Sequence, residues 1–128
     1  MAKVWSFDEA CTIAGELYGN VLARNSDNAG FKHTVNQLNS GNESVREIVR
    51  RFCTSEEFRE KYIMNQTPNE FAKRLLSRLG RDRRPDPQAI KVLAVALVER
   101  DWRQVVEEVV NSPAYKQAYG EDGVPLWA

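Results

Sequence analysis

The sequence predicts an all-α fold, a compact single domain of about seven to eight short helices that spans residues 1–128. Two observations predict it. Helix start signals recur along the whole chain, and no stretch of four or more residues alternates cleanly between apolar and polar side chains, as a half-buried strand would. The expected helices span about residues 7–19, 29–39, 45–53, 56–63, 68–79, 87–99, 102–111 and 113–119.

The start signals are side chains that can accept hydrogen bonds from the free N–H groups of a first turn. Three of them have the capping-box form, with a hydroxyl residue followed three positions later by Glu: Ser6 to Glu9, Ser44 to Glu47 and Thr67 to Glu70. Two more place a cap residue before a proline, at Asp86-Pro87 and Ser112-Pro113. Glycines are expected to end helices at Gly19, Gly41, Gly80 and Gly120.

Apolar residues follow the helical period in the second half of the chain. One set is Val92, Leu93, Ala96 and Leu97, and the other is Val105, Val106, Val109 and Val110. The second set is β-branched, but its i, i+1, i+4, i+5 spacing, with Glu107 and Glu108 opposite, still favours a helix over a strand.

An internal echo indicates two loosely repeated halves. The segments 55–62 and 112–119 share the form S-x-x-aromatic-x-x-x-aromatic, at an offset of about 57 positions counted in the sequence. The aromatic pairs, Phe58 with Tyr62 and Tyr115 with Tyr119, are expected to pack inward as core.

Composition excludes several classes of protein. Eighteen basic and eighteen acidic side chains cancel, so no overall field favours nucleic acid or an anionic membrane. No apolar run is long enough to span a membrane, and the N-terminus lacks a secretory signal, so the default location is cytoplasmic. Cys11 and Cys53 are expected to be buried, reduced thiols, and with His33 they are too few to form a metal site.

Nothing in the sequence predicts an enzyme. There is no G-x-S-x-G, no glycine-rich phosphate loop and no H-E-x-x-H. His33 has no catalytic partner at a recognisable spacing, and adjacent acids such as Glu107 and Glu108 diverge by about 100° on a helix.

Three stretches together resemble the linker-polypeptide domain of phycobilisomes. They are the S-V-R-E helix and the serine-capped aromatic helix of residues 44–62, the L-G-R ending of residues 74–81 with Pro85-Asp86, and the closing S-P-A-Y-K-Q-A-Y-G-E-D-G-V-P of residues 112–125. Their order and spacing are similar to the family's over about residues 18–127. The chain departs from the family in being neutral, where these linkers are typically basic. It also has Leu126 before Trp127, where an aromatic residue usually follows Val-Pro.

The first half also resembles a related bacterial helical domain of unassigned role. The matching residues are Leu22-Ala-Arg24, Asp27, Gly30-Phe31, Leu38-Asn-Ser-Gly41 and Ser55-Glu-Glu-Phe58. This second resemblance keeps an alternative open, namely a stand-alone protein–protein interaction domain unrelated to light harvesting.

The linker resemblance implies a non-enzymatic structural protein of the photosynthetic antenna. It would bind within rings of phycobiliproteins, phycocyanin or allophycocyanin, and would tune the bilins that those partners carry while binding no cofactor covalently. It would then lie on the cytoplasmic side of the thylakoid membrane, associated peripherally through the phycobilisome.

Candidate contact residues lie in the densest cluster of positive charge, between Lys73 and Arg84. Three interpretations are open: cations placed at a helix C-terminus, a nucleic-acid patch, or a patch that meets acidic surfaces of a phycobiliprotein ring. The neutral chain and the lack of interleaved aromatics argue against nucleic acid. The candidate partner-binding residues are Arg74, Arg78, Arg81, Arg83, Arg84 and Trp127.

The ending beyond Gly120 has no counterpart in the first half. It is either a clasp that folds Val124 and Trp127 back onto the domain or an edge offered to a partner. The clasp is slightly favoured.

Overall fold

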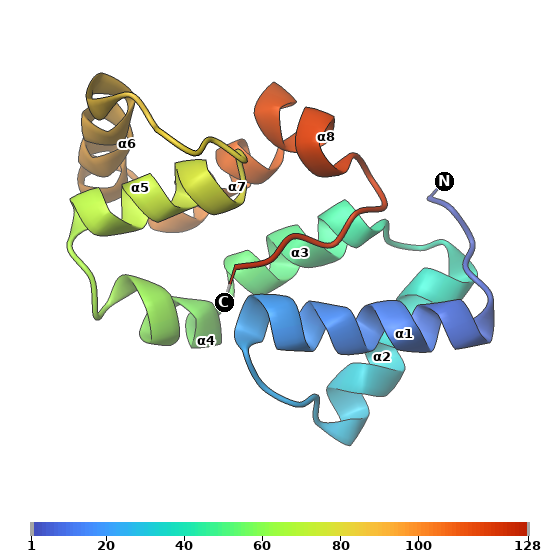
Figure 1. The fold of residues 1–128 in the computed structure, drawn as a ribbon. Coiled ribbons are helices and arrows are strands. Elements are labelled where there is room, and N and C mark those ends of the chain that lie inside the picture. The colour runs from blue at the N-terminus through green and yellow to red at the C-terminus, as the bar shows by residue number, and fades with distance from the viewer. Residues whose placement is uncertain (1, 128) are drawn as a thin grey trace. The chain divides into compact units, whose positions relative to one another are not determined.

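The computed structural model describes residues 2–127, whose regular structure is helical, as predicted, with no strand in that range (Figure 1). Eight α-helices and two π-helical segments follow one another. In chain order they are α1 (Phe7–Leu17), η1 (Tyr18–Leu22), α2 (Asn28–Ser40), α3 (Val45–Cys53), α4 (Glu56–Phe58), η2 (Arg59–Ile63), α5 (Pro68–Arg78), α6 (Pro87–Glu99), α7 (Trp102–Val110) and α8 (Pro113–Tyr119). Within the described range, no helix combines the length and the apolar character needed to cross a membrane.

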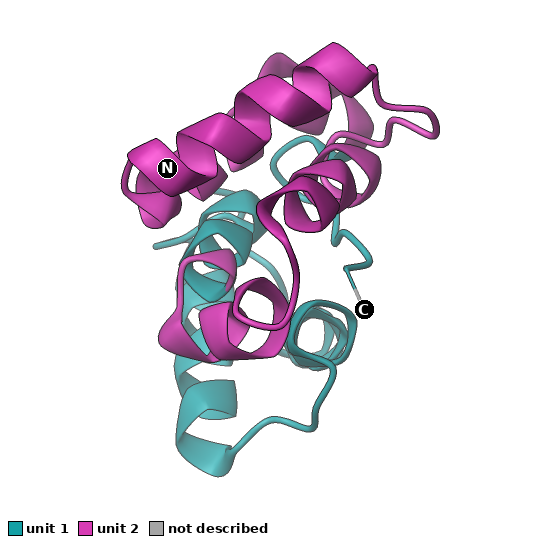
Figure 2. Ribbon diagram, turned by 90° about the vertical axis from the view of Figure 1, so that its left-hand side faces the viewer, with its two compact units in different colours: residues 1–52, 119–128 teal, residues 53–118 magenta. Residues whose placement is uncertain are grey.

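The chain divides into two compact units, coloured separately in Figure 2. Unit 1 comprises residues 1–52 and 119–128, and unit 2 comprises residues 53–118. The prediction of a single domain over residues 1–128 stays a prediction.

In unit 1, α1 begins at a complete capping box. Ser6 Oγ accepts from the Glu9 N–H at 3.2 Å, and Glu9 Oε1 accepts from the Ser6 N–H at 3.2 Å. The predicted stop at Gly19 is wrong, because the chain continues as η1 and turns only at Ala23, whose φ is +53°. Val21 and Leu22 are buried in the extra turn, and burial of two such side chains outweighs the poor helix propensity of one glycine.

The turn into α2 explains the sequence pattern around Asp27 and Gly30. Asp27 caps α2 by accepting from the Gly30 N–H at 2.9 Å, and the Arg24 guanidinium lies 5.1 Å from the centre of the Tyr18 ring. A Cβ on Gly30 would overlap the Tyr18 hydroxyl. This pattern therefore builds the packing of α1 and η1 against α2, which ends as predicted at Gly41 with φ of +74°.

In unit 2, Ser55 caps α4 by accepting from the Phe58 N–H at 3.2 Å. The Phe58 ring packs against Tyr62 at 4.9 Å and against Phe71 of α5 at 6.3 Å between centroids. Helix α5 packs on α6, and α6 packs on α7. The buried hydrophobic residues of this unit are Cys53, Phe58, Phe71, Ala72, Leu75, Leu79, Ala94, Val105, Val106, Val110 and Tyr115.

The helix starts predicted at Ser44, Thr67, Asp86 and Ser112 are also confirmed, each by a side-chain oxygen that accepts from a backbone N–H two or three residues later. Gly120, with φ of +64°, ends α8 as predicted, and Gly80 follows the C-cap of α5.

The internal echo corresponds to the helices. A shift of about 57 positions places α2, α3 and α4 on α6, α7 and α8. The predicted inward aromatics are confirmed most fully for Phe58 and Tyr115, both completely buried, while Tyr62 and Tyr119 are half-buried.

The prediction for the apolar face of α6 is wrong at Val92, which is 61% exposed. Leu93, Ala96 and Leu97 are half-buried. The helical period shows which side chains share a face, but it cannot show which face other helices cover.

Replacing Gly41 by Ala should lower the free energy of unfolding by about 2 kcal/mol or more, because an L-residue is strained at positive φ. The added Cβ would also lie 2.9 Å from the Ala2 carbonyl oxygen and from Val4 Cγ2. Urea denaturation followed by circular dichroism measures the change. The matched control is Gly15→Ala, whose Cβ would have no atom within 4 Å in the middle of α1. It should raise stability by about 0.5–1 kcal/mol. Equal effects of the two substitutions would contradict this account.

Candidate functional site

The first candidate site is the basic segment, defined here as Lys73, Arg74, Arg78, Arg81, Arg83 and Arg84. It occupies the last two turns of α5 and the loop that leads to α6, entirely within unit 2. All of its side chains are exposed except Arg74, which is half-buried. Arg74 and Arg78, four positions apart, share one face of α5.

The loop that carries the last three arginines has a defined backbone. Arg81 adopts a left-handed conformation, with φ of +54°, and the Asp82 N–H donates to the Leu76 carbonyl oxygen at 3.1 Å. Gly80 permits this close return, because a Cβ there would lie 2.7 Å from the same oxygen. The L-G-R sequence therefore folds the chain back over the end of α5 and presents the charged side chains that follow.

The two ends of the basic segment have different surroundings. At its start, the Arg74 guanidinium lies 5.6 Å from the centre of the Tyr62 ring, in the geometry of a cation–π contact. Burial raises the pKa of the Tyr62 phenol, and the positive charge of Arg74 opposes that rise. At the other end, the Arg84 N–H donates to Asp82 Oδ1 at 3.0 Å, which orders the backbone and leaves the guanidinium exposed.

Part of the positive charge of the basic segment stabilises helix α5. Arg78 lies in the last turn of α5, where a cation interacts favourably with the negative end of the helix dipole. Arg81, Arg83 and Arg84 lie beyond the helix, where that interaction falls away. The exposed arginines of the loop are thus the part of the segment that the helix dipole explains least.

The second candidate site is the C-terminal segment, which returns to unit 1 after α8 (Figure 1). The Glu121 carbonyl oxygen accepts from the Arg46 N–H at 3.1 Å, and Glu121 Oε1 accepts from Arg46 Nε at 2.8 Å. At the end of the segment, the Trp127 N–H donates to the Asn20 carbonyl oxygen at 2.9 Å. The segment is therefore tied to unit 1 at both ends, at the start of α3 and at η1.

Trp127 belongs to this clasp and not to an exposed edge. Its side chain is 0% exposed and is the largest of the fully buried side chains. Pro125 is buried, Val124 is half-buried, and Leu126 is 52% exposed. The tentative role of Trp127 as a partner contact therefore does not fit its position, because a buried indole offers no surface to a partner.

The closing acidic turn also lines an open polar cleft of about 610 Å³ in unit 1. Glu47, which contributes to it, is committed to the cap of α3, with its carboxylate accepting from the Ser44 N–H at 3.1 Å. Glu121 is paired with Arg46. The lining residues are Ala2, Lys3, Gly41, Asn42, Ser44, Glu47, Glu121 and Asp122.

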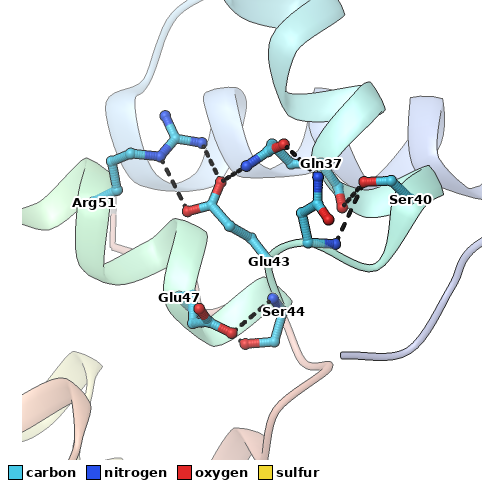
Figure 3. Close-up of polar contacts among 7 residues, drawn as sticks. Gln37, Ser40, Glu43, Ser44, Glu47 and Arg51 are labelled. Atoms are coloured by element: carbon cyan, nitrogen blue, oxygen red, sulfur yellow. Dashed lines mark hydrogen bonds and ion pairs between the residues drawn. The ribbon is translucent and has the colours of Figure 1, made fainter. Parts of the chain in front are cut away.

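A polar network that the sequence analysis missed lies in unit 1, between the end of α2 and α3 (Figure 3). Glu43, whose side chain is 15% exposed, accepts from Gln37 Nε2 at 3.1 Å and from Arg51 Nη2 at 3.2 Å. These contacts hold the start of the S-V-R-E helix against α2. The spacing of eight residues between Glu43 and Arg51 crosses a helix boundary, so no helical period marks it.

The cysteines and the histidine have separate environments. Cys53 is fully buried, and burial raises the pKa of its thiol, so the reactive thiolate is disfavoured. Cys11 is half-buried in α1, and His33 is exposed on α2. Between residues 2 and 127, no three His, Cys, Asp or Glu side chains cluster as metal ligands would.

Comparison with known protein families gives a match over nearly the whole chain. The model of the phycobilisome linker polypeptide family matches residues 5–127. The chain belongs to the phycobilisome linker polypeptide family. The S-V-R-E, L-G-R and Y-G-E-D segments on which the resemblance was based are the start of α3, the end of α5 and the acidic turn of the clasp.

Two relatives have been found among known proteins. The phycobiliprotein ApcE of Nostoc sp. (strain PCC 7120) is 36% identical over 90 residues, which cover 70% of this chain and 8% of that protein. The phycobilisome 27.9 kDa linker polypeptide, phycoerythrin-associated, rod, of Microchaete diplosiphon is 27% identical over 128 residues, which cover 95% of this chain and 50% of that protein. The chain thus spans half or less of the length of each relative.

Replacing Trp127 by Ala should lower the free energy of unfolding by about 3–5 kcal/mol, as expected for truncation of a fully buried large aromatic side chain. Leu126→Ala, next to it and 52% exposed, is the matched control and should change stability by less than about 0.5 kcal/mol. Urea denaturation monitored by circular dichroism compares the two variants. A Trp127→Ala protein as stable as the Leu126→Ala protein would rule out the clasp.

Proposed function

We propose that this chain is a non-enzymatic structural linker that binds within phycobiliprotein rings, helps assemble the phycobilisome and modulates the environment of the bilins those rings carry. The observation that carries this proposal is the family match over residues 5–127. The candidate partners are phycocyanin and allophycocyanin, and the name of the rod relative adds phycoerythrin. Such a linker would lie on the cytoplasmic side of the thylakoid membrane, held there through the antenna.

The basic segment supplies a contact surface of suitable chemistry. Arginine binds carboxylates with two parallel hydrogen bonds and stacks on planar groups, so it suits both an acidic ring surface and the neighbourhood of a bilin. Arg81, Arg83 and Arg84 are exposed on a loop whose backbone is held by its own hydrogen bonds, which lowers the entropy lost on binding. Arg74 and Arg78 extend the same charge along α5.

The clasp has a supporting role in this proposal. Because Trp127 is buried, we assign the closing segment to the stability of unit 1 and not to direct contact with a ring. Direct contact with a ring would then be made by the basic segment.

Reversing the two loop charges in Arg83→Glu/Arg84→Glu should weaken binding to purified phycocyanin, allophycocyanin or phycoerythrin about tenfold or more. Co-sedimentation and the shift in bilin absorption on mixing measure the binding. The matched control is Lys32→Glu/Lys116→Glu, which changes the net charge equally at exposed positions outside the segment and should retain most of the binding. Binding of the unmodified chain should also weaken as salt rises, because exposed ionic contacts are screened.

Two outcomes would count against the proposal. If the unmodified chain binds none of the three phycobiliproteins at low or moderate salt, the linker function is overturned. If it binds and both double variants lose binding equally, the function stands, but the contact depends on overall charge and not on the basic segment.

A further inference from the structure

An exposed apolar stripe runs along α6 in unit 2. Val92, Val95 and Val98 are 61%, 44% and 68% exposed, and their spacing of three residues keeps them within about 60° of the direction of Val95. Between Ala89 and Val98 the only charged residue is Lys91, and Ala94 is the only buried residue of the helix. A helix that is apolar on most of its circumference is normally covered on more than one side.

The other repeat shows what such a stripe does when it is covered. The shift of about 57 positions places the three valines on Val35 and Leu38 of α2 and on Gly41, its C-cap, all buried. Helix α1 packs on α2, and the N-terminal segment also reaches the end of α2, since the Trp5 N–H donates to the Leu38 carbonyl oxygen at 3.2 Å. Asn39 Nδ2 donates to the Trp5 carbonyl oxygen at 2.8 Å on the same helix. In α6 the equivalent positions face solvent.

Two shallow hollows flank the stripe, where the start of α5 meets α6. One has a volume of about 300 Å³, and the other about 410 Å³. Val95, Val98 and Glu99 belong to the first, and Ile90 and Lys91 to the second. Side chains of another helix laid along α6 would enter these hollows.

The charged residues beside the stripe indicate which helix could pack along α6. Lys91 and Glu99 are both exposed and lie four positions to either side of Val95, while Val92 and Val98 lie three positions to either side. When a second α6 lies antiparallel and is centred on Val95, Lys91 of each copy comes level with Glu99 of the other, and Val92 comes level with Val98. A parallel pairing in register would instead bring lysine to lysine and glutamate to glutamate. The stripe is thus complementary to itself in one orientation.

We propose that α6 is a self-association surface, on which two copies of this chain pair antiparallel about a two-fold axis that passes beside Val95. Such an interface is isologous, since the same patch serves on both copies. The partner is a second copy of this chain and not a phycobiliprotein, so the proposal stands apart from the linker function and uses residues outside the basic segment.

Sedimentation velocity of the full-length chain alone, over a range of concentrations, tests the proposal. The unmodified protein should shift from monomer to dimer as its concentration rises. Val95→Glu, which places two carboxylates beside the axis, should weaken dimerisation on the order of a hundredfold. Met64→Glu, at an apolar residue in unit 2 that is 63% exposed and lies off α6, is the control and should dimerise normally. Circular dichroism checks that each variant is folded.

A charge exchange tests the orientation. Lys91→Glu and Glu99→Lys should each weaken dimerisation about tenfold, because each turns both cross-pairs repulsive. The double variant Lys91→Glu/Glu99→Lys should recover the original affinity, and so should an equimolar mixture of the two single variants.

Three results would overturn the proposal. The first is an unmodified chain that stays monomeric up to about 1 mM, where a Kd corresponds to only about −4 kcal/mol. The second is dimerisation that survives Val95→Glu. The third is single charge variants that lose affinity without recovery in the double variant. If the chain is monomeric and Val95→Glu instead abolishes phycobiliprotein binding, the stripe belongs to the antenna partner.

Discussion

The hydrogen bond from a backbone N–H to the side chain of a preceding Ser, Thr or Asp is the interaction on which the rest of this structure depends. The α-helices have at most 13 residues, and isolated helices of that length are marginal in water. Each helix start leaves free N–H groups, and a side-chain cap satisfies one of them for about 1 kcal/mol. Capped starts recur in both units, for example at Ser6, Asp27, Thr67 and Asp101, so the start of each of these short helices is stabilised locally as well as by packing.

This dependence explains how much of the fold was predictable. Caps are local and lie within three residues, so the sequence indicates every helix start to within a residue or so. Helix ends are less local. Gly19 does not stop its helix, because the burial of Val21 and Leu22 one turn later favours continuation as a π-helical segment. The exposure of Val92 was unpredictable for a related reason, since α6 is apolar on most sides and only the neighbouring helices decide which side is covered.

The candidate sites were likewise predictable only in their local features. The charge of the basic segment is plain in the sequence, and so is its position at a helix end. Its geometry is not, because the Arg74–Tyr62 contact joins residues 12 positions apart across a loop, and the return of Asp82 to Leu76 requires a left-handed Arg81. The clasp includes a contact between residues that lie still further apart in the sequence, since 75 positions separate Arg46 from Glu121. No local sequence pattern predicts such a contact.

The two repeats differ in the exposure of their equivalent helices. In unit 1 the equivalent positions at α2 are buried, whereas in unit 2 the stripe of α6 and the loop arginines are both exposed. A Val side chain gains about 1.5 kcal/mol or more on burial, so three exposed valines represent stabilisation that this chain alone does not realise. The loop arginines and the valine stripe differ in how contacts at each respond to salt. Salt screens the charges of the arginines and leaves contact between apolar side chains largely unaffected. Raising salt would therefore weaken the contact of the loop arginines, whereas in the α6 contact it would screen only the Lys91–Glu99 pairs and leave the contact between valines largely unchanged.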